Sequence, residues 1–304
     1  MAILTIHSHV ASGHVGNRAA VFALETLGHD VCAVNTVELS AHPGHAESSG
    51  GAVAPARVAA ILDGLRRQGA FAHARAVLTG YLGGVATAER ALAAVKAVKK
   101  ARPDALYLCD PVLGDVREGL YVPDSLARWI KEEAVPRADI LTPNAFELAY
   151  LSGRPAGSET EALAAARMLA GKGRRIVVAT SIAPDRATRV GKKTGQKKPA
   201  PGTSPDASIV TIAVAGTRAW RVTTPRLGSR AKGAGDLLAA LFLGHYLRDR
   251  ASALPASRSV SSAYAVMAAA EAGGQAGAAL DLPLVAGRAA LIDPVPRFVA
   301  EPIG

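Results

Sequence analysis

The chain has 304 residues, of which 49% are hydrophobic and only 4% aromatic, and its formal net charge is +10. A core poor in aromatic side chains must be built from Ala, Val, Leu and Ile, which suits helices packed on a parallel sheet better than an aromatic-rich β-sandwich. No apolar run reaches the roughly 18 residues of a membrane span, so no membrane association is expected.

The cysteines and the N-terminus indicate a cytoplasmic protein. Cys32 and Cys109 both lie in apolar, strand-like runs, which favours buried thiols over a disulfide or a metal pair. The first residues lack a basic segment before the first apolar run, so no signal peptide is predicted.

The positive charge alone does not predict nucleic-acid binding. The basic residues are not interleaved with aromatic ones, and no nucleic-acid-binding motif accompanies them. Part of the excess falls in segment 186–198, which holds six Lys and Arg residues and is interpreted as a solvated loop. An anionic small molecule such as a nucleoside triphosphate would also be attracted to this charge.

Strand and helix patterns alternate along the first half of the chain. The predicted elements are a strand over Ile3–Ile6, a helix over Gly16–Leu27, a strand over Val31–Asn35, a helix from Pro55 to about Gln68, a strand over Ala76–Thr79, a helix over Ala86–Lys100 and a strand over Leu106–Cys109. Segment Ser40–Pro55 is rich in Gly, Ser, Pro and His, which predicts an excursion or lid rather than a core element.

The second half continues this alternation. The predicted elements are a helix from about Pro123 to Glu133, a strand over Asp139–Thr142, helices over Ala145–Leu151 and Thr160–Ala170, a strand over Ile176–Thr180, a hairpin of Ile209–Val214 with Trp220–Thr224, and helices from about Gly235 and over Ala256–Ala272. Strands separated by helices of about 10–15 residues indicate βαβ units and a parallel sheet. With no internal repeat or linker, residues 1–304 are predicted to form one domain.

Polar residues follow five of the predicted strands. These clusters are His7-Ser8-His9, Gly80-Tyr81, the segment from Asp110 to Asp115, Thr142-Pro143-Asn144 with Glu147, and Thr180-Ser181. Ligands of open α/β sheets bind beyond the carboxyl ends of the strands, so the clusters predict one site. The alternative is local: Ser8 and Asn144 could cap helices, and Asp110 before Pro111 could fix a turn.

A glycine-rich bend at Lys232-Gly233-Ala234-Gly235-Asp236 runs into an apolar helical segment. Glycines let the backbone N–H groups approach a ligand closely, and a helix starting there directs its positive end at the same place. A carboxylate beside such an anion site is best explained as a general base that takes a proton from an attacking hydroxyl. The alternative is a glycine loop capping an ordinary helix.

Taken together, the motifs resemble the pyridoxal kinase family of the ribokinase-like superfamily of ATP-dependent small-molecule kinases. The segments that carry this resemblance cover residues 3 to about 247 and are His7-Ser8-His9-Val10 with Gly13-His14-Val15-Gly16-Asn17, Val34 to Val37, Leu78 to Leu82, Cys109 to Asp115, Tyr121-Val122-Pro123, Ala138 to Asn144 with Phe146-Glu147, and Gly233 to Asp236. The resemblance implies a three-layer α/β/α sandwich with a central, mostly parallel sheet.

The resemblance also implies a role for each matching residue. Asp236 would be the catalytic base for the 5′-hydroxymethyl group of pyridoxal, with an anion hole made by Gly233, Ala234 and Gly235. The residues matching substrate-binding positions are Ser8, Val15, Tyr81 and Asp236. Those matching the ATP region are Asp110, Asp115, Thr142, Asn144, Glu147, Thr180 and Ser181, of which Asp110 and Glu147 would serve Mg²⁺. A monovalent cation, K⁺ or Na⁺, and a homodimer are further expectations from the family.

The chain departs from the family pattern in two places. Where the family often has Phe-Ser-Asn-His-Thr, this chain has Leu39-Ser40-Ala41-His42-Pro43, which removes a ring contact and a hydroxyl. Weaker or broader binding of the B6 vitamers is therefore predicted. Some members carry a lysine in place of Thr180, so Lys232 or segment 186–198 would have to supply the charge near the phosphates.

Two other functions compete with this reading. A kinase for hydroxymethylpyrimidine or another hydroxylated ring would share the glycine loop and the fold. A non-catalytic B6 binder or carrier would keep the pocket without the reaction. The altered 39–43 segment favours that carrier, whereas Asp110, Glu147 and Asp236 oppose it.

Overall fold

The computed structural model describes residues 2–171, 173, 175–185, 208–228, 231–272, 281–292, 294 and 296–304. The basic segment 186–198 lies outside these residues. Within them, no helix is both long and apolar enough to cross a membrane.

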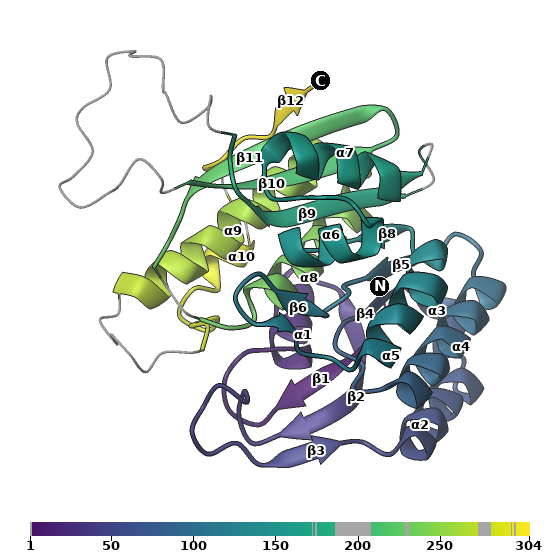
Figure 1. The fold of residues 1–304 in the computed structure, drawn as a ribbon. Helices are drawn as coiled ribbons and strands as arrows, with labels where there is room; N and C mark the ends of the chain where they lie inside the picture. The colour runs from purple at the N-terminus through teal and green to yellow at the C-terminus, as the bar shows by residue number, and fades with distance from the viewer. Residues whose placement is uncertain are drawn as a thin grey trace, which may run out of the picture.

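A ten-stranded sheet forms the middle layer, in the order β12-β11-β10-β9-β8-β5-β4-β1-β2-β3 (Figure 1). The strands are β1 Ala2–Val10, β2 Asp30–Leu39, β3 Gly50–Ala52, β4 Ala74–Thr79, β5 Leu106–Cys109, β8 Ile140–Leu141, β9 Ile176–Ile182, β10 Ser208–Ala215, β11 Arg218–Pro225 and β12 Glu301–Ile303. Neighbours from β2 to β9 pair in parallel, and the pairs at both edges are antiparallel. The carboxyl ends of the parallel strands therefore meet along one edge.

Helices cover both faces of this sheet (Figure 1). They are α1 Asn17–Thr26, α2 Pro55–Arg67, α3 Ala70–His73, α4 Val85–Ala101, α5 Asp124–Trp129, α6 Ala145–Ser152, α7 Glu159–Ala170, α8 Ala234–Arg248, α9 Ala253–Ala272 and α10 Ala289–Ile292. After α5 the chain continues through a π turn, Ile130–Ala134, and a 3-10 turn, Val135–Arg137. A small hairpin, β6 Gly114–Asp115 with β7 Gly119–Leu120, lies apart from the main sheet.

Two hydrophobic cores lie on opposite faces of the sheet because successive strand residues point to opposite sides. In β4, Val77 packs into the core shared with α2 to α7, while Ala76 and Leu78 pack into the core shared with α1, α8, α9 and α10. Fully burying a Val or Leu side chain contributes about 1.5–3 kcal/mol, so these two alternating sets hold the three layers together.

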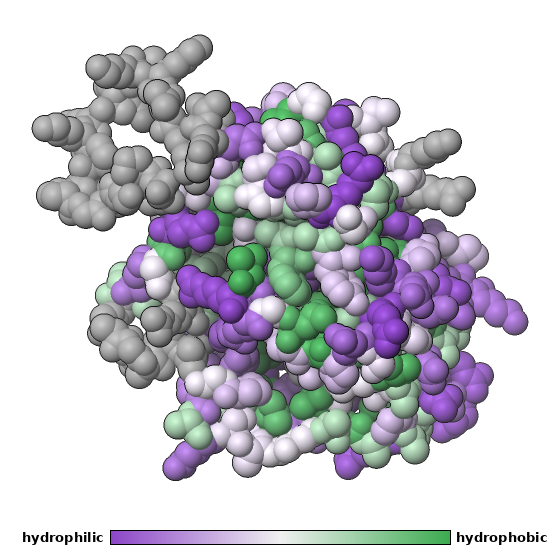
Figure 2. Space-filling model, viewed as in Figure 1, coloured by the Kyte–Doolittle hydropathy of each residue, from purple (hydrophilic) through white to green (hydrophobic). Residues whose placement is uncertain are grey.

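The outer face of one helical layer is polar. Figure 2 shows hydrophilic side chains over the helices at the right of the view, where Figure 1 places α2 to α4. The last turns of α2 and α4 carry the basic pairs Arg66-Arg67 and Lys99-Lys100. Cations in a last turn interact favourably with the helix dipole.

The architecture confirms the predicted α/β/α sandwich with a mostly parallel sheet, with three local differences. First, the first strand does not end at Ile6, because His7, His9 and Val10 continue to pair with β2. Second, the excursion contains β3, which pairs with β2 through the backbone of glycine-rich residues 50–52. Third, the short elements α3, β6, β7, α10 and β12 were not predicted, and the helix predicted to about Glu133 ends as α5 at Trp129.

Candidate active site

The N-terminus of helix α8 is open to an approaching ligand. Gly233 caps the helix at φ 92°, a left-handed conformation suited to glycine, and a Cβ atom there would lie 2.3 Å from the carbonyl oxygen of His14. The first intrahelical hydrogen bond runs from the Leu237 N–H to the Gly233 carbonyl. The N–H groups of Ala234 and Gly235 precede this bond, and a Cβ atom on Gly235 would meet nothing within 4 Å. These amides form a site suited to an anion.

Asp236 stands in the first turn of α8 and accepts a hydrogen bond on each carboxylate oxygen. Oδ1 lies 3.1 Å from Nε2 of His7, and Oδ2 accepts the Gly16 N–H at 2.6 Å. Burial of Asp236 acts to raise its pKa, but the interaction with His7 and the hydrogen bond from Gly16 outweigh that effect. The pKa of Asp236 therefore lies below its ordinary value, and the group is an ionised base near neutral pH.

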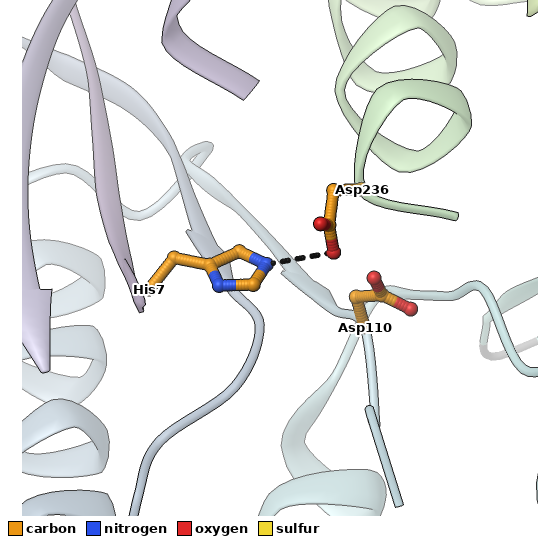
Figure 3. A group of neighbouring side chains, drawn as sticks. All are labelled: His7, Asp110 and Asp236. Carbon is orange, nitrogen blue, oxygen red and sulfur yellow. Dashed lines mark hydrogen bonds and ion pairs between the residues drawn. The ribbon is translucent and has the colours of Figure 1, made fainter. Parts of the chain in front are cut away.

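Asp110 faces the same space from the end of β5. Its Oδ1 accepts the Thr142 hydroxyl at 2.9 Å, and ligand atoms of His7, Asp110 and Asp236 all lie within 4.8 Å of one another (Figure 3). Burial, and then the negative charges of Glu147 and Asp236, raise the pKa of Asp110 well above its ordinary value. A cation in this space would relieve that repulsion.

Glu147 combines a capping role with a buried charge. Its Oε2 accepts the Asn144 N–H at 2.9 Å while Asn144 Oδ1 accepts the Glu147 N–H at 3.0 Å, which is the capping box of α6. Its Oε1 accepts the Leu113 N–H at 2.8 Å. Burial raises the pKa of Glu147 to about 7, against these backbone hydrogen bonds, which lower it.

The three residues matched to ring-binding positions lie around His7 and Gly233. Ser8 Oγ is 3.2 Å from Nδ1 of His7, and the Tyr81 N–H donates to the same nitrogen at 3.2 Å. Val15 is buried, and its Cγ1 would lie 3.1 Å from a Cβ atom on Gly233. These residues and Asp236 thus share one neighbourhood.

The remaining predicted ATP-region residues differ in their placement. Thr180 forms a bridge with Asn144, and its N–H donates to the Pro143 carbonyl at 2.9 Å. Ser181 follows it as an exposed residue at φ 60°. The Asp115 carboxylate accepts two backbone N–H groups of its own turn, those of Arg117 and Glu118. Asp115 therefore has a local structural role in this structure.

Lys232, one of two predicted candidates for the positive charge near the phosphates, forms an ion pair with Glu118. Its Nζ lies 3.2 Å from Oε1 of Glu118, which belongs to the turn between β6 and β7. This partly exposed ion pair brings the hairpin next to the glycine loop.

Comparisons with known proteins identify the family. A family model described as phosphomethylpyrimidine kinase matches residues 72–276. The pyridoxal kinase PdxY of Rubrobacter xylanophilus is 41% identical over 296 residues, which cover 97% of this chain and 95% of that protein. That of Corynebacterium diphtheriae is 40% identical over 264 residues, or 87% of each chain. The chain belongs to the pyridoxal kinase family.

A solved member of the pyridoxal kinase family has the same fold over the full chain. The structure titled pyridoxal kinase from Leishmania donovani in complex with ADP superposes with a TM-score of 0.86 at 27% identity, covering 100% of this chain and 99% of that one. The family and the fold predicted from the motifs are thereby confirmed.

The acidic groups fit the Mg²⁺ expected from the family. Mg²⁺ takes oxygen ligands and keeps several waters, so it needs few protein carboxylates. Asp110 offers a buried carboxylate whose pKa is raised first by burial and then by the charges of Glu147 and Asp236, so a cation would stabilise its ionised form. Each Glu147 oxygen already accepts one backbone hydrogen bond, so Glu147 fits better as a contributor of charge nearby. Asp110 is the stronger candidate ligand.

Two residues that contact Asp236 were not predicted as site residues. His7 was part of a polar strand end and of a matching motif, and Gly16 was part of the same motif, but neither was given a role. The position of His7, directly after the predicted strand Ile3–Ile6, was the available signal. Gly16 acts through its backbone N–H, which leaves no trace in side-chain chemistry.

Proposed function

We propose that this protein is an ATP-dependent pyridoxal kinase that transfers the γ-phosphoryl group to the 5′-hydroxymethyl oxygen of pyridoxal. The observation that carries this proposal is the position of the ionised Asp236 at the open N-terminus of α8, 4.8 Å or less from Asp110. Relatives named pyridoxal kinase and the ADP complex of the Leishmania donovani protein support it.

The reaction follows from the roles of these groups. Asp236 accepts the proton of the substrate hydroxyl as its oxygen attacks the γ-phosphorus, and the bond from that phosphorus to the bridging oxygen breaks to release ADP. The N–H groups of Ala234 and Gly235 stabilise the charge on the phosphoryl oxygens. Mg²⁺, when bound, neutralises phosphate charge, and Asp110 would hold it, with Glu147 adding negative charge.

Ser8, Val15 and Tyr81 are proposed to hold the pyridine ring. Their closeness to His7 and Gly233 would bring a ring substituent within reach of Asp236. Thr142, Asn144, Thr180 and Ser181 are proposed to line the nucleotide side, with Asp115 acting through its turn.

Further family expectations are included in the proposal. The chain is proposed to work as one kinase domain, as a homodimer in the cytoplasm, with a K⁺ or Na⁺ ion beside the nucleotide. Size-exclusion chromatography with light scattering tests the dimer, and replacing K⁺ by Na⁺ or by a bulky organic cation during turnover tests the monovalent ion.

A substrate panel tests the main proposal. Enzyme, Mg²⁺ and ATP are incubated with pyridoxal, pyridoxine, pyridoxamine or hydroxymethylpyrimidine while ADP release is followed. Release with pyridoxal supports the proposal, and Asp236→Asn should lower kcat by about 10²–10⁴-fold while ATP still binds. Normal turnover by Asp236→Asn would remove the base assignment.

The second candidate is a hydroxymethylpyrimidine kinase, favoured by the description of the matching family model. ADP release with hydroxymethylpyrimidine and none with pyridoxal would establish it. Tight binding of pyridoxal 5′-phosphate without ADP release from any substrate would instead favour a carrier.

A further inference from the structure

The backbone groups around His7 determine which of its ring nitrogens carries the proton. Its Nδ1 lies 2.8 Å from the backbone N–H of Ser8 and 3.2 Å from that of Tyr81. Backbone N–H groups can only donate, so Nδ1 must present a lone pair to them. The ring proton is therefore on Nε2, where it points at Oδ1 of Asp236 at 3.1 Å (Figure 3).

Two donors from different parts of the chain thus hold one carboxylate. His7 comes from β1 and reaches Oδ1, while Gly16, which precedes α1, donates its N–H to Oδ2 at 2.6 Å. Asp236 itself comes from α8, and its side chain is only 15% exposed. With both oxygens engaged, rotation of the carboxylate is restricted and one lone pair of each oxygen is left for other partners.

The same tautomer excludes two other roles for His7. His7, Asp110 and Asp236 have the ligand types of a metal site, but coordination through Nε2 would require a proton on Nδ1, facing two backbone N–H groups. A proton relay through the ring would require Nδ1 to pass the proton on, but the Ser8 and Tyr81 N–H groups that face Nδ1 cannot accept it. The Ser8 hydroxyl, 3.2 Å from Nδ1, can donate to the same lone pair. His7 is left with an orienting role.

We propose that His7 is a positioning residue for Asp236. Its neutral imidazole, protonated on Nε2, orients the carboxylate so that a free lone pair faces the hydroxyl that loses its proton. This inference rests on the proposed kinase function. In this role His7 does not contact the substrate, so loss of the His7 side chain should lower kcat rather than weaken the binding of pyridoxal.

Two substitutions of His7 test the contacts of its two ring nitrogens separately. The side-chain oxygen of Asn reaches about as far as Nδ1, and the side-chain amide of Gln about as far as Nε2. His7→Asn keeps an acceptor for the Ser8 and Tyr81 N–H groups but loses the donor to Asp236. His7→Gln keeps that donor. Both are small polar changes at one buried position.

The kinetic test compares the two variants with the wild type in ADP release with saturating Mg·ATP. His7→Asn should lower kcat about 10- to 100-fold, with the KM values for ATP and pyridoxal within about twofold. His7→Gln should recover most of that loss. Wild-type kcat in His7→Asn, or equal impairment of both variants, would overturn the inference. An inactive wild type would instead refute the proposed function.

A spectroscopic test works even if the variants fold poorly and needs no turnover. Two-bond ¹⁵N–¹H spectra of the wild-type protein report the tautomer of each of its eight histidines. The His7 signals are assigned by selective labelling or through-bond experiments. The Nε2–H pattern at neutral pH supports the inference, whereas an Nδ1–H pattern or an imidazolium at this position overturns it.

Discussion

Gly80 leaves the space that the imidazole of His7 occupies: a Cβ atom at position 80 would lie 1.9 Å from Nε2 and 2.1 Å from Cδ2 of that ring. The Gly80 N–H donates to the Ile6 carbonyl at 3.2 Å, so the backbone is tied to β1 and the ring would have to move. We predict that Gly80→Ala lowers kcat about 10- to 100-fold by displacing His7 from Asp236.

Steady-state ADP release measures this effect, and Gly84→Ala is the matched control. A Cβ atom on Gly84 would meet nothing within 4 Å, and its φ of 178° is open to any residue. Gly84→Ala should therefore keep the wild-type kcat. Equal kcat values for the two alanine variants would contradict the prediction.

The buried carboxylate of Asp110 predicts a pH-dependent stability of the metal-free protein. Burial, and then Glu147 and Asp236, raise the pKa of Asp110, so above the unfolded value of about 3.8 the folded state binds more protons than the unfolded state. The free energy of unfolding therefore falls as pH rises through this window. Asp110→Asn removes the charge, and its amide oxygen can still accept the Thr142 hydroxyl.

We expect the Tm of Asp110→Asn to exceed that of the wild type at pH 8, measured with a chelator and without nucleotide, and the excess to shrink toward pH 5. Mg·ATP turnover by the variant should be lost. Asp115→Asn is the control, since that carboxylate is partly exposed and bonded within its own turn. A Tm difference for Asp110→Asn that does not change with pH would argue against this account.

The sequence predicted the parts of the fold that depend on local patterns. Apolar runs such as Leu106–Cys109 and the bend at Gly233-Ala234-Gly235 carry their signal in adjacent residues, and β5 and the start of α8 lie where predicted. The two interpretations of Asn144, helix cap and site residue, do not exclude each other. Asn144 caps α6 through Glu147 and also bridges to Thr180.

What the sequence did not reveal depends on contacts between distant residues. His7 and Asp236 are 229 positions apart, and their hydrogen bond follows from the meeting of β1 with α8. The tautomer of His7 depends on backbone N–H groups, which are the same for every residue type except proline. β3 was missed for a related reason, because residues Gly50–Ala52 pair through their backbone and have no apolar alternation.

The buried side chain of His245 is a position where we expect a stabilising substitution outside the candidate active site. It is buried in α8, and neither ring nitrogen has a hydrogen-bond partner among the residues that the structure describes. Burial, and then the charges of Arg258 and Arg248, lower its pKa to about 4. We predict that His245→Leu raises the free energy of unfolding by about 1–2 kcal/mol at pH 7, because it removes an unpaired buried polar group.

The stability that His245→Leu gains over the wild type should increase as the pH is lowered. Between the unfolded value of about 6.5 and the folded value of about 4, the unfolded state binds the proton that the folded His245 does not, so wild-type stability falls as pH drops. His29→Leu is the control, because this buried histidine has no partner for Nδ1 but contacts the Gly244 carbonyl through Nε2 at 3.1 Å, so its replacement also removes a hydrogen bond. Urea unfolding at pH 7 and 5 measures both, and a gain in His29→Leu equal to that in His245→Leu would refute the argument.

Leu39 and Pro43 depart from the family pattern, and we predict that the protein binds pyridoxal more weakly than it would with an aromatic residue at position 39 and a hydroxyl at position 43. Leu39 ends β2 and pairs with Val10 and Gly50, and the loop that follows places His42 where its protonated form would lower the pKa of Asp236. Position 43 is exposed on this loop. The ring contact and the hydrogen bond are each worth about 1 kcal/mol.

We therefore expect the double variant Leu39→Phe, Pro43→Thr to lower the KM for pyridoxal about 5- to 30-fold, while kcat changes less than about twofold, because the added contacts act on binding and leave Asp236 in place. Glu47→Gln, an exposed change in the same loop, is the control and should leave KM unchanged. Initial rates across a pyridoxal series at saturating Mg·ATP give both constants. A KM equal to that of the wild type would mean that residues 39 and 43 do not contact the ring.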